Sequence, residues 1–397
     1  MNNLPITNTQ SEITKKITFK FKCGSVYDGE CKDGHITGQG KMTYISGAIF
    51  EGIWKNDNKY LGKMIFVNGN IYDGQWKNGK MEGEGTFIYK SGVYEGGVYE
   101  GTWEDNGNSS IGKMTYKNGD IYEGNWPKAK KHGEGKMTYT NGDIYEGEWK
   151  NDKSFLGKMS YSKGDIYSGF WKNDKYHDEG TLIYKCGDVY NGQWKNGKID
   201  GEGNMRYKCN DIYNGEWEEG YKNGYGNMIY KNGNVYEGEW DNDKMDGYGK
   251  MTYKNGDIYD GYWYYDIING YGKMRYKNGD RYSGDWECEV INGHGEMRYR
   301  NGDIYHGEWE DGEIHGEGEM KYKNGHIYNG QWEYGKKNGI GKISIKEKIL
   351  YEGHWIYDKK HGGGFIYDNK TNCEGVWINH GNTFVNKDIL LKIFEFL

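Results

Sequence analysis

All 15 tryptophans of this chain fall in one five-residue frame, Tyr/Phe-x-Gly-x-Trp or a close variant of it. The frame returns every 22–23 residues, as in Tyr122–Trp126, Tyr145–Trp149 and Tyr236–Trp240. A fixed period across nearly the whole sequence indicates stacked copies of one small unit, not a globular domain around a single core. We therefore expect any function to lie on a long repetitive surface.

Counting the frame along the chain gives 16 units. They begin at Tyr27, Phe50, Tyr72, Tyr99, Tyr122, Tyr145, Tyr167, Tyr190, Tyr213, Tyr236, Tyr259, Tyr282, Tyr305, Tyr328, Tyr351 and Cys373. The first unit has Cys31 at the tryptophan position and the last has Cys373 at the tyrosine position. Such atypical ends are expected of the repeats that cap a stack. The one irregular interval, between Tyr72 and Tyr99, predicts a β-bulge or a kink in the sheet.

Each unit has the pattern of a β-hairpin, and residues 236–263 show it well. In Tyr236–Trp240, large residues and glycine alternate with acids at the period of a strand. A polar turn at Asp241–Asp246 leads to a second predicted strand, Gly247–Tyr253. The turn into the next unit, Lys254–Gly256, carries the Asn-Gly signal of a hairpin. A three-residue loop with Gly256 in the left-handed conformation keeps the large residues on one face.

This turn length predicts a cross-strand register. The expected pairs are Met251 with Tyr259, Gly249 with Gly261 and Gly247 with Trp263. Glycine opposite a ring leaves the ring room to pack. In the same register, charged pairs are Lys250 with Asp260, Lys136 with Glu146 and Lys113 with Glu123. We therefore interpret the lysines as a self-neutralising ladder that contributes about 0.2–1 kcal/mol per pair, with a dedicated anion-binding face as the alternative.

The motif resembles the MORN repeat (membrane occupation and recognition nexus). The resemblance rests on Tyr-x-Gly-x-Trp, a polar turn, Gly-x-Gly-x-Met/Leu-x-Tyr and Asn-Gly-Asp, as in Tyr122–Asp143 and Tyr305–Gly325, and it covers residues 27–377. It implies an all-β fold, an elongated single-layer antiparallel sheet of about 16 tandem hairpins, to which the sequence adds a short C-terminal capping helix. The resemblance also implies a scaffold or a membrane-proximal organiser. Lipid binding is the role in the family's name, while many members resemble protein-interaction or dimerisation modules.

Composition limits the classes of partner. The formal net charge is -7, so bulk attraction to nucleic acid or to anionic lipid is not expected, although a local basic column is compatible with it. The 39 tyrosines against 11 phenylalanines indicate rings buried in a thin layer, with hydroxyls that reach water. We find no signal peptide and no run of 18 apolar residues, which predicts an intracellular, cytoplasmic protein, at the membrane periphery if it binds lipid.

The six cysteines indicate a reducing compartment. Cys186 and Cys209 occupy equivalent turns of neighbouring hairpins, and such positions lie about 9–10 Å apart, which is too far for a disulfide. A pair between Cys23 and Cys31 stays open as the alternative to free thiols.

The two ends differ from the array. We divide the chain into a tail and cap strand (1–20), the repeat array (21–377) and a C-terminal helix or cap (378–397). Asn386 or Asp388 is the expected N-cap of this helix. Its apolar face is predicted to comprise Ile389, Leu390, Ile393, Phe394 and Leu397. The helix is expected to cover the last hairpin, with partner binding or membrane binding as alternatives. The run also resembles the first helix of an F-box motif, which suggests at most a truncated remnant.

No pattern in the sequence predicts catalysis, a cofactor or a metal site. The stretch Gly74–Met81 resembles a phosphate-binding loop, but Met81 stands where Ser or Thr is required and no helix is expected after it. His132, His315 and His361 share a turn position without zinc-ligand spacing. Met245 breaks the calcium-loop pattern of the acids around it. We therefore predict a protein that is not an enzyme.

The leading hypothesis is a scaffold that binds proteins, or a second copy of itself, along an aromatic ribbon. The homodimer is implied by the resemblance alone. The candidate interaction surface comprises Tyr122, Trp126, Tyr145, Trp149, Tyr236, Trp240, Tyr259, Trp263, Tyr305 and Trp309. The alternative is a peripheral membrane adaptor for acidic phospholipids or phosphoinositides, with the C-terminal helix as its membrane or partner contact. The protein partner is not identifiable from the sequence, and nucleic acid is not expected.

Overall fold

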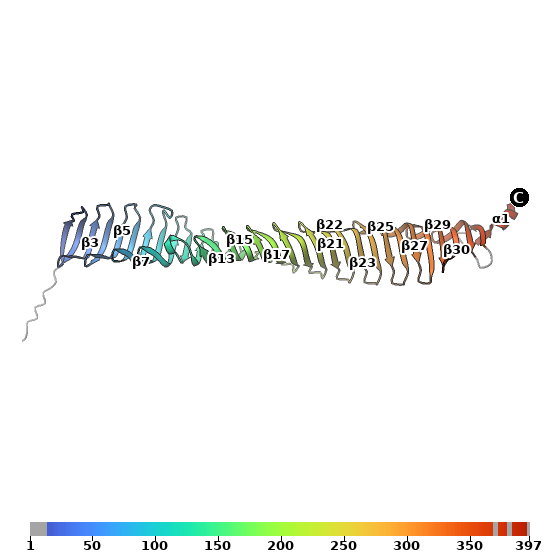
Figure 1. Ribbon diagram of the computed structural model, residues 1–397, viewed down its shortest axis with the longest axis horizontal. Coiled ribbons are helices and arrows are strands. Elements are labelled where there is room, and N and C mark those ends of the chain that lie inside the picture. The colour runs from blue at the N-terminus through green and yellow to red at the C-terminus, as the bar shows by residue number, and fades with distance from the viewer. Residues whose placement is uncertain (1–13, 368–371, 379–382, 395–397) are drawn as a thin grey trace, which may run out of the picture. The chain divides into compact units, whose positions relative to one another are not determined.

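The computed structural model describes residues 14–367, 372–378 and 383–394 (Figure 1). The chain divides into two compact units, residues 1–198 and 199–397. In each unit the chain forms an antiparallel sheet of consecutive hairpin strands. The described pairings within a unit join strands that follow one another in sequence, as β1 with β2 and β32 with β33. The predicted all-β fold of tandem hairpins is confirmed.

In the first unit, residues 1–198, sixteen strands and one short 3-10 helix follow the chain in order. They are β1 (Lys15–Lys20), β2 (Val26–Lys32), β3 (His35–Thr43), β4 (Ile49–Lys55), β5 (Asn58–Ile65), β6 (Ile71–Lys77), β7 (Lys80–Ile88), β8 (Val98–Glu104), β9 (Gly107–Thr115), β10 (Ile121–Gly124), η1 (Pro127–Ala129), β11 (Gly133–Thr138), β12 (Ile144–Lys150), β13 (Lys153–Ser160), β14 (Ile166–Lys172), β15 (Lys175–Ile183) and β16 (Val189–Lys195).

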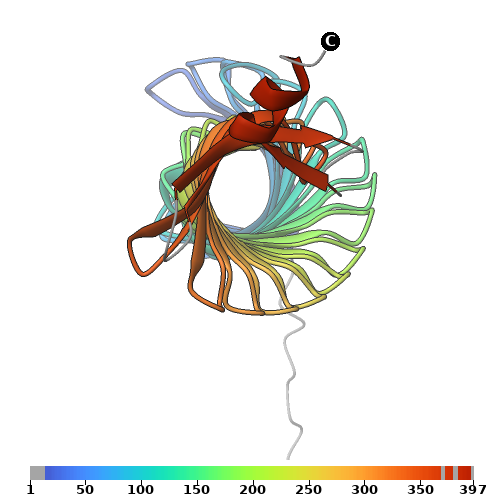
Figure 2. The same ribbon diagram turned by 90° about the vertical axis from the view of Figure 1, so that its right-hand side faces the viewer.

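The second unit, residues 199–397, continues the same pattern and ends in a short helix. Its elements are β17 (Lys198–Arg206), β18 (Ile212–Glu218), β19 (Tyr221–Ile229), β20 (Val235–Asp241), β21 (Lys244–Thr252), β22 (Ile258–Tyr264), β23 (Ile267–Arg275), β24 (Arg281–Glu287), β25 (Val290–Arg298), β26 (Ile304–Glu310), β27 (Glu313–Lys321), β28 (His326–Glu333), β29 (Lys336–Ile345), β30 (Lys348–Ile356), β31 (Lys359–Tyr367), β32 (Asn372–Ile378), β33 (Thr383–Asn386) and α1 (Lys387–Phe394). Within each unit, successive hairpins rotate about the sheet axis, as the twist of strands requires (Figure 2).

The two faces of the sheet differ because the side chains of a strand alternate. On β20, Tyr236, Gly238 and Trp240 are buried, whereas Glu237 and Glu239 are exposed. We call the face of the tyrosines and tryptophans the inner face, and the face of the acids and lysines the outer face. This division repeats along both units, so each sheet has a continuous apolar face and a continuous charged one.

The predicted register is confirmed in every pair named for the type unit. Met251 lies opposite Tyr259, Gly249 opposite Gly261, Gly247 opposite Trp263 and Lys250 opposite Asp260. The turn between them also has the expected length. The Tyr253 N–H donates to the Asp257 carbonyl at 2.9 Å, and Gly256 has a φ of +98°, in the left-handed region. A side chain at Gly256 would strain this turn.

The turn inside each hairpin is shorter than we predicted. Strand β21 begins at Lys244, three residues before the expected Gly247. Asn242 and Asp243 form a two-residue turn with φ of +47° and +69°, the geometry of a type I′ hairpin. A register shift between Gly238 and Trp240 accommodates the extra pairing. We assigned residues 241–246 to a turn because they are mostly polar, but polar residues such as Lys244 and Asp246 belong to the outer face of strand β21.

The expected bulge or kink between Tyr72 and Tyr99 is wrong. Strands β7 and β8 pair in continuous register, and the additional residues lie in the turn Tyr89–Gly97, closed by a hydrogen bond from the Tyr89 N–H to the Gly97 carbonyl. An irregularity that we did not predict follows at η1, where Pro127 interrupts the hairpin after the short strand β10. The Tyr94 hydroxyl, from the long turn, donates to the Ala129 carbonyl at 2.7 Å. The two irregular segments therefore contact each other.

Each end of the array carries one additional strand outside the repeats that we counted. At the N-terminal end, β1 is the predicted cap strand, while residues 1–13 lie outside the described part. At the other end, β33, which the sequence did not predict, pairs with β32 before α1 begins. The Asp388 N–H donates to Asn386 Oδ1 at 2.8 Å, so Asn386 is the N-cap. Helix α1 contacts β32 and β33, in agreement with the short C-terminal helix we predicted.

The described cysteine side chains are free thiols, namely those of Cys23, Cys31, Cys186, Cys209 and Cys288. The alternative disulfide between Cys23 and Cys31 does not form. The side chain of Cys373 is outside the described set. Among the helical segments that the structure describes, none has the length and apolar character needed to cross a lipid bilayer.

Candidate interaction surfaces

The tyrosine of each frame lies flat over a pair of glycines on the inner face. Tyr236 covers Gly238 and Gly249, and a Cβ at Gly249 would collide with the Tyr236 ring. The Tyr236 hydroxyl donates to the carbonyl of Glu239 at 2.9 Å. The glycines are therefore required by the ring above them, and the ring buries its polar group without leaving it unpaired.

The tryptophans join consecutive units into an aromatic ladder. The ring of Tyr236 lies 5.2 Å from Trp240 of its own unit and 5.4 Å from Trp263 of the next, edge to face in both cases. The Trp263 Nε1–H donates to the Gly249 carbonyl at 3.1 Å. Aromatic pairs of this geometry contribute about 0.5–1.5 kcal/mol beyond their buried area. Each unit therefore depends directly on its neighbour.

The ten residues predicted as the candidate interaction surface belong to this ladder. They are Tyr122, Trp126, Tyr145, Trp149, Tyr236, Trp240, Tyr259, Trp263, Tyr305 and Trp309, each at most 5% exposed. These rings are buried, because each is covered by the ring of the adjacent unit, and their role in partner binding stays a prediction. The side chains that a partner could reach without displacing this ladder lie on the outer face.

The predicted C-terminal contact is described only in part. Ile389 is exposed, as its proposed role requires, but so is Leu391, which the predicted face did not include. Leu390, Ile393 and Phe394 lie within α1, but their side chains are outside the described set, and Leu397 lies outside the described residues. This contact therefore stays a prediction.

One column of the inner face carries lysines in contact with the ladder. The ammonium of Lys222 lies 4.6 Å from the ring of Trp240, and that of Lys131 lies 4.2 Å from Trp149. In the next two units Met245 and Ile268 occupy the position of Lys222. Burial lowers the pKa of the Lys222 ammonium, and nearby Asp243 partly opposes this effect. The cation–π contact offsets only part of the desolvation of the charge.

Replacing Lys222 with methionine should therefore stabilise the protein by about 1 kcal/mol, since it removes a buried charge and keeps the volume. The gain should shrink as the pH rises toward 10.5. The folded-state pKa of Lys222 is lowered, so the penalty is full at neutral pH and disappears once the unfolded chain also loses the proton. Urea unfolding followed by tryptophan fluorescence measures the change. The exposed Lys254→Met is the control and should leave the midpoint unchanged; an equal shift in both variants would contradict the explanation.

The outer face carries the charged ladder that we predicted. Lys250 lies opposite Asp260, Lys136 opposite Glu146 and Lys113 opposite Glu123. Within the described part of the chain, only Lys136 and Glu146 of these pairs reach ion-pair distance, at 3.2 Å. The ladder neutralises charge along the face, but its exposed pairs contribute little stability.

An exposed tyrosine patch interrupts this ladder in the second unit. It comprises Tyr225, Tyr248, Tyr262, Tyr264, Tyr265 and Tyr271, each between 47% and 60% exposed. Tyr248 and Tyr262 lie opposite each other, with ring centroids 5.4 Å apart. The signal was present in the sequence, because the central residue of Gly-x-Gly is tyrosine in three consecutive units. Elsewhere that position holds residues such as Glu202 and Glu317.

The outer face of the second unit also has a hollow near its C-terminal end. The hollow has a volume of about 580 Å³ and is lined in part by Ile340, Phe365 and Val376. Ile340 is 59% exposed. Within the described segments, no cluster of three or more His, Cys, Asp or Glu could hold a metal ion.

Comparison with family models gives fourteen matches to the model described as "MORN repeat". They cover residues 27–49, 72–94, 99–121, 122–144, 145–166, 167–189, 190–208, 213–235, 236–258, 259–281, 282–304, 305–327, 328–344 and 351–367. The chain belongs to the MORN-repeat family. Two of the sixteen MORN units that we counted, those beginning at Phe50 and Cys373, lie outside the matches, although β4 and β32 form at both positions.

Solved structures similar to this MORN-repeat chain share low identity with it. The TCP10 domain of Danio rerio CPAP is 13% identical, with a TM-score of 0.31 over 55% of this chain and 99% of that one. The SAS-4 (dCPAP) TCP domain of Drosophila melanogaster, in complex with a proline-rich motif of Ana2 (dSTIL), is 16% identical, with a TM-score of 0.26 over 39% and 84%. A streptogramin B lyase is 15% identical, with a TM-score of 0.12 over 84% and 98%. Scores this low transfer no function, and a search of curated sequences finds no match to this MORN-repeat chain.

Proposed function

We propose that this MORN-repeat chain is a non-enzymatic scaffold that binds a protein partner on its outer face, at the tyrosine patch. The observation that supports it most directly is the exposure of six tyrosines on β19, β21, β22 and β23 and in the turn at Tyr265. Tyrosine supplies a large apolar area and a hydroxyl at a low cost in conformational entropy, and it is enriched among the residues that dominate interface energy. A rigid sheet presents these rings in fixed positions.

The repeat supports a scaffold in a second way. Each unit rests on its neighbours through the buried ladder, so the outer face is free to vary without loss of the fold. The chain can therefore present several different surfaces on one rigid support, which permits multivalent contact. The tyrosine patch is one such variation, because the equivalent position in other units holds residues as different as Glu202, Leu156 and Ile340.

The alternative, a peripheral membrane adaptor, has narrower support. The MORN repeat takes its name from that role, and α1 exposes Ile389 and Leu391. Vesicle flotation with neutral and phosphoinositide-containing vesicles, with and without residues 387–397, tests it directly. Flotation of the full chain alone would favour the adaptor, whereas no flotation of either form leaves the protein scaffold as the function.

Substitution of the patch should weaken partner binding without unfolding the sheet. We expect the Tyr248→Ser/Tyr262→Ser/Tyr271→Ser variant to lose about tenfold or more in affinity for a protein captured from source-cell extract and then purified. The matched control replaces exposed tyrosines outside the patch, Tyr60→Ser/Tyr334→Ser/Tyr357→Ser. Isothermal titration calorimetry with the full chain gives both affinities.

Equal affinities of the two triple variants for the purified partner would reject the patch as the binding surface. Failure to capture any protein that binds directly would reject the scaffold itself. Analytical ultracentrifugation of the purified chain tests for a homodimer. If the wild-type chain self-associates and the patch variant does not, the partner is a second copy of the chain.

A further inference from the structure

Arginine is rare in this chain and is concentrated in one place. Of its five arginines, four lie between residues 275 and 300. Three of them are cross-strand neighbours on the outer face of β23, β24 and β25. Arg275 lies opposite Arg281, and Arg281 lies opposite Arg298, with all three exposed. We call Arg275, Arg281 and Arg298 the arginine triad.

The fold does not require arginine at these positions. In the neighbouring unit the equivalent cross-strand pair is Thr252 with Ile258, and Thr252 also faces Val235. Like charges directly opposite each other on adjacent strands destabilise a sheet. Arg298 has a local partner, since its Nε lies 2.6 Å from Glu296 Oε1. Among the residues that the structure describes, Arg275 and Arg281 have no acidic partner.

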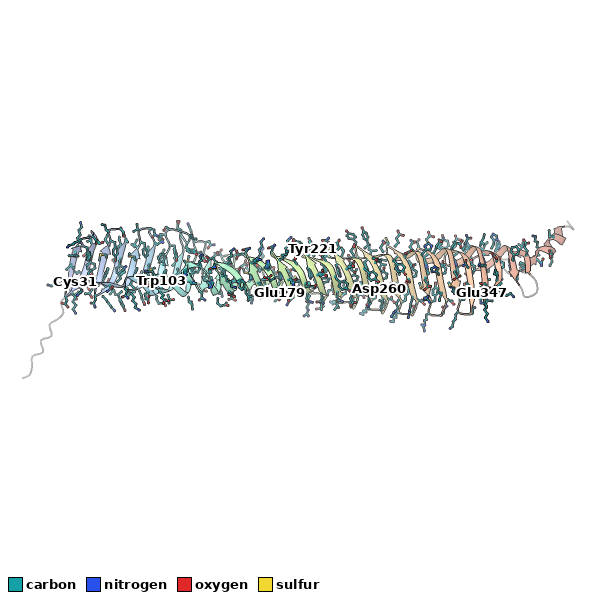
Figure 3. The ribbon with its side chains drawn as sticks, viewed as in Figure 1. Cys31, Trp103, Glu179, Tyr221, Asp260 and Glu347 are labelled. Atoms are coloured by element: carbon teal, nitrogen blue, oxygen red, sulfur yellow. The ribbon has the colours of Figure 1, made fainter. Side chains whose placement is uncertain are left out.

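Two lysines extend the positive region along the outer face. Lys250, Lys273 and the triad line one hollow of about 440 Å³, in which Asp260 (labelled in Figure 3) is the single lining acid. Lys273 lies opposite Asp260 on β22 and opposite Ser283 on β24, and Asp260 also faces Lys250, so a single carboxylate serves both lysines. Five cations therefore face a hollow that holds one carboxylate, on a chain whose net charge is -7.

We propose that this hollow binds an extended acidic segment of a partner protein, in register with the tyrosine patch. This inference rests on the proposed scaffold function and names the chemistry of the partner. The guanidinium fork of arginine binds carboxylate and phosphate groups with paired hydrogen bonds. The cations span β21 to β25, about 19 Å at the spacing of neighbouring strands, which about six extended residues would cover.

The tyrosine patch lies beside the hollow on the same strands. Tyr248 and Lys250 are both exposed on β21, and Tyr271 and Lys273 are both exposed on β23. The Tyr271 hydroxyl lies 2.7 Å from the Ser283 hydroxyl, beside Lys273. One segment can therefore place acids over the cations and apolar side chains over the rings.

The surroundings of the hollow favour a protein segment over other polyanions. Nucleic acid gains its affinity from many phosphate contacts in a row. Beyond the triad, the same row continues through Ile304 to Lys321, whose ammonium lies 2.9 Å from Glu319. Glu308 and Glu317 add negative charge to this face, which disfavours a continued phosphate backbone. A flat anionic membrane would meet the same acids. A short acidic segment, by contrast, can bind the five cations of the hollow without extending over these acids.

The test uses the full chain and a fluorescein-labelled oligoglutamate peptide of about ten residues, long enough to span the cations. We expect measurable binding by fluorescence anisotropy at about 0.1 M salt, where the screening length is about 10 Å. The Arg275→Ala/Arg281→Ala/Arg298→Ala variant should lose about tenfold or more in affinity. The control, Lys63→Ala/Lys113→Ala/Lys158→Ala, removes the same charge from lysines that face acids and should change the affinity less than about twofold.

The fold of the arginine variant is checked separately. Its urea midpoint should be unchanged or higher, since it relieves the repulsion between Arg275, Arg281 and Arg298. Oligoglutamine of equal length should not bind. Absence of oligoglutamate binding, or equal losses in both triple variants, would overturn the proposal. Tighter, triad-dependent binding of single-stranded RNA or phosphatidylserine vesicles would overturn the choice of a protein segment.

The results distinguish an error in the acidic-segment inference from an error in the proposed scaffold function. If the captured partner requires the tyrosines but oligoglutamate does not bind, only the acidic-segment inference is overturned. If oligoglutamate binds through the triad and the patch variant leaves partner affinity unchanged, only the tyrosine patch is overturned.

Discussion

Replacing Tyr236 with alanine is expected to destabilise the second unit by about 3–5 kcal/mol, the usual range for a buried aromatic ring. The ring is fully buried over Gly238 and Gly249, and it contacts Trp240 and Trp263 edge to face. Its removal leaves two tryptophans without their shared neighbour and leaves a cavity above two glycines, which have no side chains to fill it.

Tyr248→Ala is the matched control, because Tyr248 lies on the other strand of the same hairpin and on the opposite face of the sheet. It is 47% exposed and has one ring neighbour, Tyr262, so we expect a loss of less than about 1 kcal/mol. Guanidinium unfolding gives both values. Hydrogen exchange should show that Tyr236→Ala weakens the amides of β20–β22 first, because each unit contacts its neighbours. Similar losses in the two variants would contradict the ladder as the source of stability.

A second large effect is expected at alkaline pH, where the fold should be lost steeply between about pH 10 and 12. Burial raises the pKa of Tyr27, Tyr99 and Tyr351 from 10.0 to about 12, with a smaller contribution from Glu30 at Tyr27 and from Glu84 at Tyr99. A raised folded-state pKa means that the stabilisation is complete below pH 10, where both states hold the proton. It is then lost as the pH rises toward the folded value, because the unfolded chain ionises first.

The loss should be steep because many tyrosines act together. Each buried tyrosine that stays protonated while the unfolded chain ionises removes up to about 1.4 kcal/mol per pH unit. Circular dichroism and tyrosinate absorbance, followed together, should change in one transition. Ionisation of the ladder tyrosines with the sheet intact would contradict the linkage.

Tyr99→Phe is the variant that isolates this effect. Phe50 already occupies the same ladder position in its own unit and is fully buried. The buried Tyr99 hydroxyl has no hydrogen-bond partner in the described structure, so phenylalanine removes a titrating proton without breaking a bond. The alkaline midpoint should rise in this variant, while stability at neutral pH is kept or improved.

The repeat and its register were predictable from the sequence because both are local. Alternation at period two assigns residues to faces, and a three-residue turn at Lys254–Gly256 sets which residues oppose each other. The pairs Met251–Tyr259 and Gly247–Trp263 follow from these two facts alone. The short turn at Asn242-Asp243 was missed because its flanking residues are polar, and polar residues fit a loop as well as the outer face of a strand.

The candidate surface was harder to predict. The sequence shows that Tyr236 and Trp263 share a face, but not that they cover each other, since that depends on the rotation of one hairpin against the next. The arginine triad illustrates the same difficulty, because its members are 6 and 17 residues apart in sequence and become neighbours only through the pairings of β23 with β24 and of β24 with β25.

By itself, therefore, the sequence determined the hairpin unit, its period, its register and its two chemically different faces, because these follow from side-chain alternation and turn geometry within about 30 residues. The tertiary structure decided which face is available to a partner. Most of the described tryptophans donate to the carbonyl 14 residues earlier and cover the tyrosines, as Trp263 does with Gly249, so the aromatic rings are buried within the fold. The outer face is left exposed to solvent, and among its described residues the tyrosines of the patch and Arg275 and Arg281 are not required by the packing of the fold.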